Sequence, residues 1–343
     1  MKRILALIIA LTLTLALAAC GSKDASDDST DAPPAADGQT YTLTFACTIS
    51  NTSRSSASFE EALAKITERT NGAVTFNASY NGALGNEHDL GVNIVDGAID
   101  MALVGPGEWA NYDPAFYVFD TPFLYDNQEH FYKVLNSDMY KDFLKEKGDA
   151  IGMEVLITLD QGIKGIINSK HPVYAPSDLA GLKIRVPDSD ALIRVQNAMG
   201  GTATPIAASE QYTALSQGII DGADHSLAAH VVWQLYDYAK YFTETNHALQ
   251  TSYYVISAKT MASLPQEYQD IIREVMAEEQ ENQYDITIED DAGYRKTFED
   301  NGGQIVTNDE IDHEAFNAAL ADIIDEFKAN APDLYDGIRA MAD

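Results

Sequence analysis

Cysteine, basic side chains and long apolar runs are scarce in this sequence, and each shortage excludes a class of protein. Of the two cysteines, Cys20 lies in an N-terminal signal segment, so Cys47 has no partner for an internal disulfide and the fold must depend on its core. The 22 basic residues stand against 53 acidic ones, for a net charge of −31. Nucleic acid and anionic membrane surfaces are therefore poor partners. After the signal segment, no apolar run is long enough to span a bilayer.

Motifs of catalytic and cofactor sites are also missing. Gly105–Ala110 imitates a dinucleotide fingerprint, but Pro106 occupies the turn and the segment follows a third strand. His225 and His230 lack the H-E-x-x-H spacing of a zinc site, and neither a nucleophile elbow nor a P-loop occurs. We therefore expect a binding protein without cofactor or metal, and an extracytoplasmic enzyme stays open as the less favoured alternative.

The N-terminus has the pattern of a lipoprotein signal peptide. Lys2 and Arg3 precede the uncharged apolar run Ile4–Leu17, and small residues then lead to Cys20. This order is typical of a secretory signal over residues 1–19, with Cys20 as the lipid-modified first residue of the mature chain. A plain signal peptide with an incidental cysteine is the alternative. We expect an extracytoplasmic protein, lipid-anchored to a membrane at the cell surface or in the periplasm.

Residues 20–40 consist mostly of Ser, Asp, Ala and Pro and contain no large apolar side chain. Such a segment cannot bury enough surface to fold, so we interpret it as a flexible acidic linker. The folded part then begins near Tyr41. Without Lys2 and Arg3 the mature chain has 20 basic residues against 53 acidic ones, a net charge of −33.

Strands and helices alternate in the first part of the fold. Strands are predicted at Tyr41–Ile49, Val74–Tyr80 and Met101–Val104, with helices around residues 59–66 and at Glu87–Val95. This alternation indicates parallel β/α units.

The same alternation recurs within residues 178–226. Strands are predicted at Lys183–Val186 and Ala203–Pro205 and through Ala223, and a helix capped by Ser209 lies between the last two. Arg185 is at the carboxyl end of its strand, where open α/β sheets bind ligands. Its guanidinium group matches the two oxygens of a carboxylate. A surface ion pair of little energetic consequence is the alternative for Arg185.

Two extended segments, Glu154–Asp160 and Lys164–Asn168, are predicted to carry the chain from a first lobe to a second, and His247–Ser257 to return it. A long charged helix follows at Pro265–Asn301. After it we expect a short strand at Gln304–Val306 and then helices that begin with Asn308 as N-cap.

An internal repeat is consistent with two related lobes. Gly97–Ala102 and Gly218–Ala223 both read G-x-I-D-x-A at a predicted helix-to-strand joint, where Gly can adopt positive φ. Chance similarity of such joints is the competing explanation.

Two motifs carry a family resemblance. Gly181–Pro187 is one, and Glu210–Gly222, which reads E-x-Y-x-A-L-x-x-G-x-x-D-G, is the other. From about Tyr41 to about Phe327 the chain resembles the DctP-type solute-binding proteins of TRAP transporters (tripartite ATP-independent periplasmic transporters), which deliver organic acids to a membrane permease. The resemblance implies an α/β, two-lobed periplasmic-binding-protein-like fold (type II-like), with a hinge and a long bridging helix.

We accordingly expect lobe I at residues 41–159 together with part of 248–343, and lobe II at 160–247. Residues 248–343 supply the return strand, the bridging helix and C-terminal helices.

The resemblance also implies roles for single residues. In this family the residue that matches Arg185 holds the substrate carboxylate. Lys164 stands where a second Arg is usual; it keeps the charge but cannot form the bidentate fork, and whether it lines the cleft is open. His225 replaces an Asn that donates to the ligand. A neutral imidazole donates one hydrogen bond and its charge can change near neutral pH, and a structural His is the alternative.

Tyr212 matches a family Tyr, with ligand contact and core packing as equal alternatives. Ala207 and Ala208 replace a Pro and an aromatic residue, which predicts a wider pocket or one filled by Trp109 or Tyr112.

Two further candidates, Glu87 and Trp109, lie at predicted strand–helix ends of the first lobe. Helix capping by Asn86 or Glu87 is the favoured account of the acidic residue. Trp109 either stacks on the ligand or is half-buried in its loop.

The sequence therefore predicts a monomeric binding protein that closes on a small organic acid and delivers it to a TRAP-type permease. A sugar acid such as a hexuronate is expected ahead of a C4-dicarboxylate. A ligand sensor for a membrane kinase is the main alternative.

Overall fold

The computed structural model describes residues 38–342. The predicted signal peptide, the lipidation site Cys20 and nearly all of the linker lie outside the described residues. Within residues 38–342, no helix has both the length and the apolar character that crossing a membrane requires.

One ten-stranded sheet runs through the described residues in the order β2-β1-β3-β9-β4-β7-β5-β6, with β8 paired to β4 and to β10. The strands are β1 Tyr41–Ala46, β2 Val74–Ser79, β3 Met101–Val104, β4 Met153–Asn168, β5 Lys183–Val186, β6 Thr202–Pro205, β7 Gly222–Ser226, β8 Tyr241–Thr243, β9 Leu249–Ser257 and β10 Gln304–Val306.

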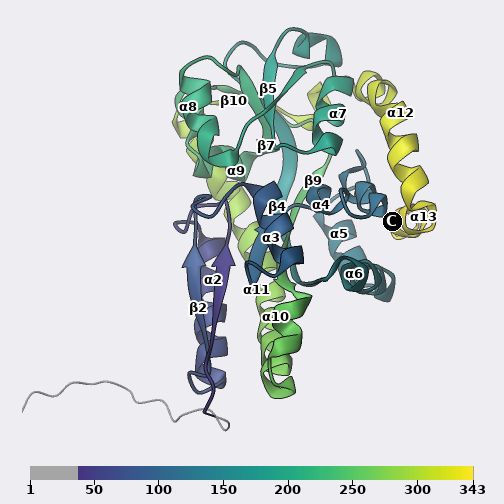
Figure 1. The fold of residues 1–343 in the computed structure, drawn as a ribbon. Coiled ribbons are helices and arrows are strands. Elements are labelled where there is room, and N and C mark those ends of the chain that lie inside the picture. The colour runs from purple at the N-terminus through teal and green to yellow at the C-terminus, as the bar shows by residue number, and fades with distance from the viewer. Residues whose placement is uncertain (1–37, 343) are drawn as a thin grey trace, which may run out of the picture. The chain divides into compact units, whose positions relative to one another are not determined.

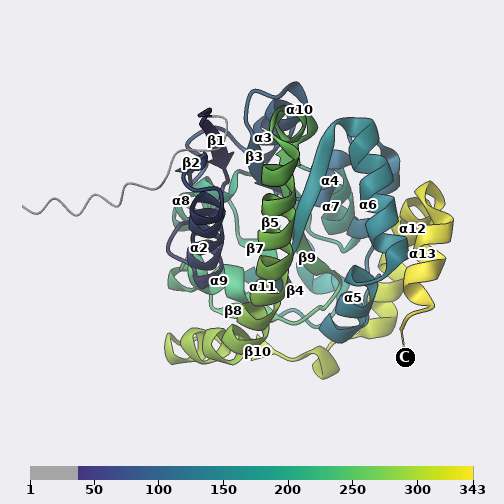
Figure 2. The ribbon, with the colours of Figure 1, turned by 90° about the horizontal axis from the view of Figure 1, so that it is seen from below.

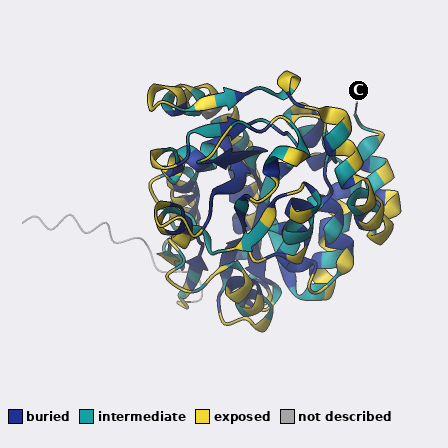
Figure 3. Cartoon of the chain, turned by 90° about the horizontal axis from the view of Figure 1, so that it is seen from above, coloured by how far each residue is buried: buried dark blue, intermediate teal, exposed yellow. Residues whose placement is uncertain are grey.

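Helices cover this sheet. The α-helices are α2 Arg54–Arg69, α3 Glu87–Asp96, α4 Pro106–Trp109, α5 Gln128–Leu135, α6 Asp138–Ile151, α7 Asp190–Ala198, α8 Gln211–Ser216, α9 Leu227–Val232, α10 Ala258–Ser263, α11 Gln266–Asp300, α12 His313–Asn330 and α13 Pro332–Arg339. Short 3₁₀ turns are η1 Pro114–Asp120, η2 Pro176–Leu179, η3 Ala208–Glu210, η4 Leu235–Asp237 and η5 Asn308–Glu310. In Figure 3 the central strands are dark blue and buried, and most of the exposed residues lie on the surrounding helices and loops.

Parallel β/α units form both sides of the sheet, as the alternation of strands and helices predicted. On one side β1 pairs in parallel with β2 and β3; on the other, β5 pairs in parallel with β6 and β7. The antiparallel pair β4 and β9 joins the two sides. Figure 1 shows β5, β7, α7 and α8 in the upper part, and β2, α2 and α3 in the lower part.

The predicted long helix is α11, with 35 residues. It packs against α2 and β4 on one side and against α9 on the other, so it spans both lobes. Figure 2 shows it crossing the face of the sheet.

Local sequence explains several helix ends. Asn86 caps α3 in a capping box with Asp89, and Gly97 ends that helix with φ 73°. Gly218, the matching glycine of the internal repeat, has φ 69°. Both glycines therefore adopt the left-handed conformation that the repeat predicted, at equivalent helix-to-strand joints.

Two predicted helix starts were wrong. Ser209 caps no helix, because it lies inside the turn η3 and α8 begins only at Gln211. Asn308 likewise lies in the turn η5, whereas α12 begins after Asp312, whose side chain accepts from the N–H of Ala315. The two extended segments before residue 168 form one strand, β4, because pairing with β9 continues past a register shift between Asp160 and Ile163.

Candidate ligand-binding site

A cavity of about 100 Å³ lies between the two sides of the sheet. Loops and helix starts of residues 48–120 form one wall, and residues 185–233 form the other. Strand β4 and residues 247–252 lie between these walls. The polar and charged side chains that line it are Thr48, Glu87, Glu108, Asp120, Gln161, Lys164, Arg185, Ser189, Asp224, His225, His247, Gln250, Thr251 and Ser252.

Arg185 lines this cavity and is almost fully buried, with 2% of its surface exposed. Its Nε donates to the carbonyl oxygen of Ile206 at 2.7 Å, and its Nη1 donates to Nε2 of His225. These two bonds fix the plane of the guanidinium group. Burial lowers the pKa of Arg185 to about 10, although Glu87 and Asp224 oppose the shift. The group therefore stays cationic at neutral pH.

His225 supports Arg185 as a neutral imidazole. Because Nε2 accepts from Arg185, the proton lies on Nδ1, which faces the Gln250 side-chain oxygen at 3.2 Å. Burial and the Arg185 charge hold the pKa of His225 well below its usual range. The prediction that its charge can change near neutral pH is therefore wrong.

Lys164 also lines the cavity, on β4 opposite β7. Its Nζ lies 3.5 Å from Oδ2 of Asp224, and the other carboxylate oxygen lies 3.4 Å from Nε2 of His247. Burial alone raises the pKa of Asp224, but Lys164 and His247 outweigh it and lower that pKa. Lys164 thus has a buried counter-ion within the protein.

Glu87 lines the cavity from the first turn of α3. Its carboxylate accepts from the N–H of Gly105 at 3.1 Å and from the Thr48 hydroxyl at 3.4 Å. Capping of α3 is carried out by Asn86, so the favoured capping account does not apply to Glu87.

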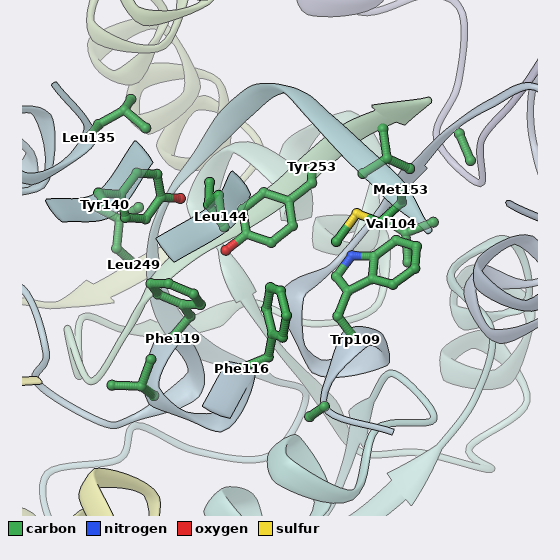
Figure 4. Packing of buried hydrophobic residues seen from close by; sticks show 14 of the residues in the cluster. Val104, Trp109, Phe116, Phe119, Leu135, Tyr140, Leu144, Met153, Leu249 and Tyr253 are labelled. Atoms are coloured by element: carbon green, nitrogen blue, oxygen red, sulfur yellow. The ribbon is translucent and has the colours of Figure 1, made fainter. Parts of the chain in front are cut away.

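Two predicted contacts lie outside the cavity lining. The Tyr212 hydroxyl donates to Asp237 at 3.0 Å, and the ring packs edge-on against Tyr238. Trp109 is fully buried in the hydrophobic core beside Val104 and Phe116, so its indole is neither half-buried nor positioned to stack on a ligand (Figure 4).

Sequence reasoning missed several carboxyl groups of the site. Asp120, at the end of η1, has a buried Oδ2 without a hydrogen-bond partner. Burial raises its pKa to about 7, with Lys164 opposing the shift. Burial also raises the pKa of Glu108, whose carboxylate contacts the imidazole of His88.

A second, more open space of about 400 Å³ adjoins the cavity and shares Arg185, Glu87 and Glu108 with it. Ala207 and Ala208 both line this space. Neither Trp109 nor Tyr112 lines either space, so neither of them fills the site beside the two alanines.

The charge balance limits what the cavity can hold. Two cations, Lys164 and Arg185, face four carboxyl groups, those of Glu87, Glu108, Asp120 and Asp224. Since Lys164 is paired with Asp224, Arg185 is the cation that a ligand carboxylate can approach. The other carboxyl groups are suited to accept hydrogen bonds from hydroxyl groups.

Comparison with known proteins shows the family of this chain. Residues 45–330 match the family model of bacterial extracellular solute-binding proteins, family 7 (DctP). A solute-binding protein of Chromohalobacter salexigens is 29% identical over 278 residues, 80% of this chain and 81% of that protein. The 2,3-diketo-L-gulonate-binding periplasmic protein YiaO of Escherichia coli is 28% identical over 277 residues, 80% of this chain and 83% of that protein.

A solved structure agrees with these relatives. A TRAP periplasmic solute-binding protein of Chromohalobacter salexigens with bound D-glucuronate is similar at TM-score 0.81 and 25% identity, over 87% of this chain and 98% of that chain. The predicted two-lobed fold is confirmed, and the chain belongs to the bacterial extracellular solute-binding proteins of family 7, as a TRAP-type solute-binding protein.

Proposed function

We propose that this protein captures a sugar acid, a hexuronate or an aldonate, and delivers it to a TRAP-type permease. The observation that carries the proposal is the composition of the cavity: one cation open to a carboxylate, Arg185, among several carboxyl groups and amides. A sugar acid has the matching chemistry, with one carboxylate and many hydroxyl groups.

The carboxylate is assigned to Arg185. Charge-assisted bonds from a guanidinium group are short and strong, and the bonds to Ile206 and His225 hold this one in position before the ligand arrives. The remaining predicted contacts with the ligand are Glu87, Lys164 and His225, all of which line the cavity. Tyr212 is left out of the proposed site, and so is Trp109.

A C4-dicarboxylate suits this cavity less well. Its second carboxylate would need a second cation, and Lys164 is already paired with Asp224 at 3.5 Å. It would also lie among Glu87, Glu108 and Asp120, and like charges disfavour binding. The 2,3-diketo-L-gulonate of the Escherichia coli relative and the D-glucuronate of the solved structure support the sugar-acid class.

Closure of two lobes would bury the acid. We assign lobe I to residues 41–159 with part of 248–343, and lobe II to residues 160–247. Strand β4 crosses this boundary and its pairing with β9 shifts register between Asp160 and Ile163, a suitable place for hinge bending. Lipid on Cys20 would hold the monomeric protein at the membrane beside its permease, and no reaction is catalysed.

A thermal-shift panel on the mature chain tests the proposal. D-glucuronate, D-galacturonate and D-galactonate are compared with succinate, malate, and the neutral sugars glucose and galactose. At 100-fold the Kd a ligand adds about 2.7 kcal/mol of stability, which is readily measured. We expect a shift with at least one sugar acid and none with its neutral counterpart. A shift with succinate alone, or with a neutral sugar alone, would overturn the substrate class.

A further inference from the structure

A second recognition point in the cavity involves Gly107, Asp120 and Ser189, all of which line it. Oδ2 of Asp120 and Oγ of Ser189 are both buried and lack a hydrogen-bond partner in the described structure. Leaving a buried oxygen without a hydrogen-bond partner is unfavourable, so buried oxygens normally have a partner. Both therefore point to a polar group that binds between them.

Ser189 is positioned for this role rather than for capping a helix. It occupies the N-cap position of α7, yet its side chain makes no capping hydrogen bond. Serine at an N-cap ordinarily accepts from a backbone N–H of the first turn. The hydroxyl is instead available to the cavity.

Gly107 keeps the space between the two oxygens open. A Cβ at this position would stand 2.6 Å from Oγ of Ser189 and 2.9 Å from Oδ2 of Asp120. The φ of Gly107 is not in the left-handed region, so the backbone does not require glycine there. The absence of a side chain matters because a Cβ would clash with both oxygens and block the approach to them from the cavity.

The chemistry of the three residues selects the occupant. The ionised form of Asp120 would repel a carboxylate. An ammonium group could donate to both oxygens, but it would leave the Ser189 O–H without an acceptor. A hydroxyl group fits both, since it donates to the Asp120 carboxylate and accepts from Ser189. Phe119, Leu192 and Val195 add an apolar wall to the cavity, which suits the carbon skeleton of a sugar.

We infer that Gly107, Asp120 and Ser189 form a hydroxyl-binding subsite that makes the protein discriminate a polyhydroxylated acid from its deoxy analogues. The inference rests on the proposed function and goes beyond it, because it assigns a second recognition point besides the Arg185 carboxylate site.

The test combines protein variants with ligand analogues. Isothermal titration calorimetry on the mature chain measures Kd for D-glucuronate, D-galacturonate and their 2-, 3- and 4-deoxy forms. Ser189→Ala and Asp120→Ala should each weaken binding of the parent acid by about 10-fold. For one deoxy form, wild-type binding should already be weaker by a similar factor, and Ser189→Ala should cause no further loss.

Two further variants separate recognition from folding. Gly107→Ala should weaken binding of the parent acid, and it should leave the Kd of that one deoxy form nearly unchanged. Ser216→Ala, at an exposed serine on α8, is the matched control and should change nothing. Equal losses for every analogue, or no loss, would overturn the subsite and leave the proposed function intact. If wild type binds none of the acids, the proposed function fails and this inference fails with it.

Discussion

At the scale of single residues, the cavity depends on one buried arginine whose partners leave it charged and oriented. Arg185 is held by a backbone carbonyl and by a neutral imidazole, neither of which neutralises it. A ligand carboxylate therefore approaches a guanidinium group that burial has largely removed from water and that is still charged. This arrangement gives a strong interaction, because the surroundings have a low dielectric constant.

Removing that cation should abolish most of the affinity. We expect Arg185→Ala to weaken binding of the sugar acid by roughly 2–5 kcal/mol, because the buried carboxylate loses its partner. Arg185→Lys should also weaken it, since the guanidinium fork is lost. Calorimetry measures both effects, with the exposed Arg273→Ala as a matched control. Unchanged affinity in Arg185→Ala would remove this residue from the site.

Asp120 predicts a pH dependence of stability. Its pKa is about 7 in the folded chain against an ordinary value of 3.8, so the folded state holds this proton more tightly than the unfolded chain. The contribution of Asp120 to stability is therefore greatest at low pH and falls as pH rises from about 4 to about 7. Asp120→Asn, which cannot ionise, should raise Tm by roughly 2–4 °C near pH 8 and change little near pH 4. A Tm change that is equal at both pH values would contradict the shifted pKa.

Asp224 shows the opposite dependence. Burial raises its pKa, but Lys164 and His247 lower it further, to below the ordinary value. Asp224 therefore stabilises the folded state at pH values above its pKa in the unfolded chain. This stabilisation is lost as the pH falls through its lower pKa in the folded chain. Asp224→Asn leaves Lys164 buried without a counter-ion and should destabilise the protein by about 3–5 kcal/mol. Urea unfolding near pH 7 measures this loss, and a loss below about 1 kcal/mol would show that Lys164 finds another partner.

At the scale of elements, β4 connects the two sides of the sheet and crosses the proposed boundary between the lobes. It pairs with β9 along one part and with β7 and β8 along another. Gly162, beside the register shift, has φ 89°, and a Cβ there would approach Cβ of Ser226 at 3.1 Å. Glycine is therefore favoured at this position for two reasons: the positive φ and the lack of space for a side chain.

Two glycine substitutions should change the stability of the protein in opposite directions. Gly162→Ala should destabilise the protein by about 1–3 kcal/mol because of the strained φ and the close contact. Gly293→Ala, in α11 with nothing within 4 Å of the added Cβ, should stabilise it by about 0.5–1 kcal/mol through helix propensity. Thermal unfolding of the two variants side by side measures the contrast. Stabilisation by Gly162→Ala would show that the positive φ is not required.

At the scale of the whole molecule, ligand affinity and lobe closure should be coupled. The cavity is lined by residues on both sides of the predicted boundary in β4, so an acid bound there contacts both lobes. We expect D-glucuronate, or whichever sugar acid binds, to reduce the radius of gyration measured by small-angle scattering. Arg185→Ala at the same ligand concentration should stay open. No change in the wild type at saturating ligand would mean that the site is already closed without ligand.

The sequence predicted much of the fold for identifiable reasons. β3, β5 and β10 have the predicted bounds, because a Gly or Pro directly adjoins each of these short extended segments. The helix ends at Ser209 and Asn308 were wrong because 3₁₀ turns use the same capping residues as α-helices. The two predicted extended segments belong to one strand, β4, and its pairing with β9 shifts register between them.

Of the candidate site, Arg185, Lys164, His225 and Glu87 line the cavity, as strand ends and helix starts of an α/β sheet predict. Trp109 could not be placed from its loop, since burial depends on packing against Val104 and Phe116 rather than on neighbours in sequence.

The sequence by itself determined the family, the alternation of strands and helices and the position of Arg185, because these follow from local pattern and motif. Only the tertiary structure decided which side chains of the site lie together, which are paired and which are charged. It brought Asp120 and Ser189 to Gly107, paired Lys164 with Asp224 and made His225 a neutral acceptor. Burial and charge pairing arise only when distant segments pack together, and they set both the protonation of the cavity and the ligand that it can hold.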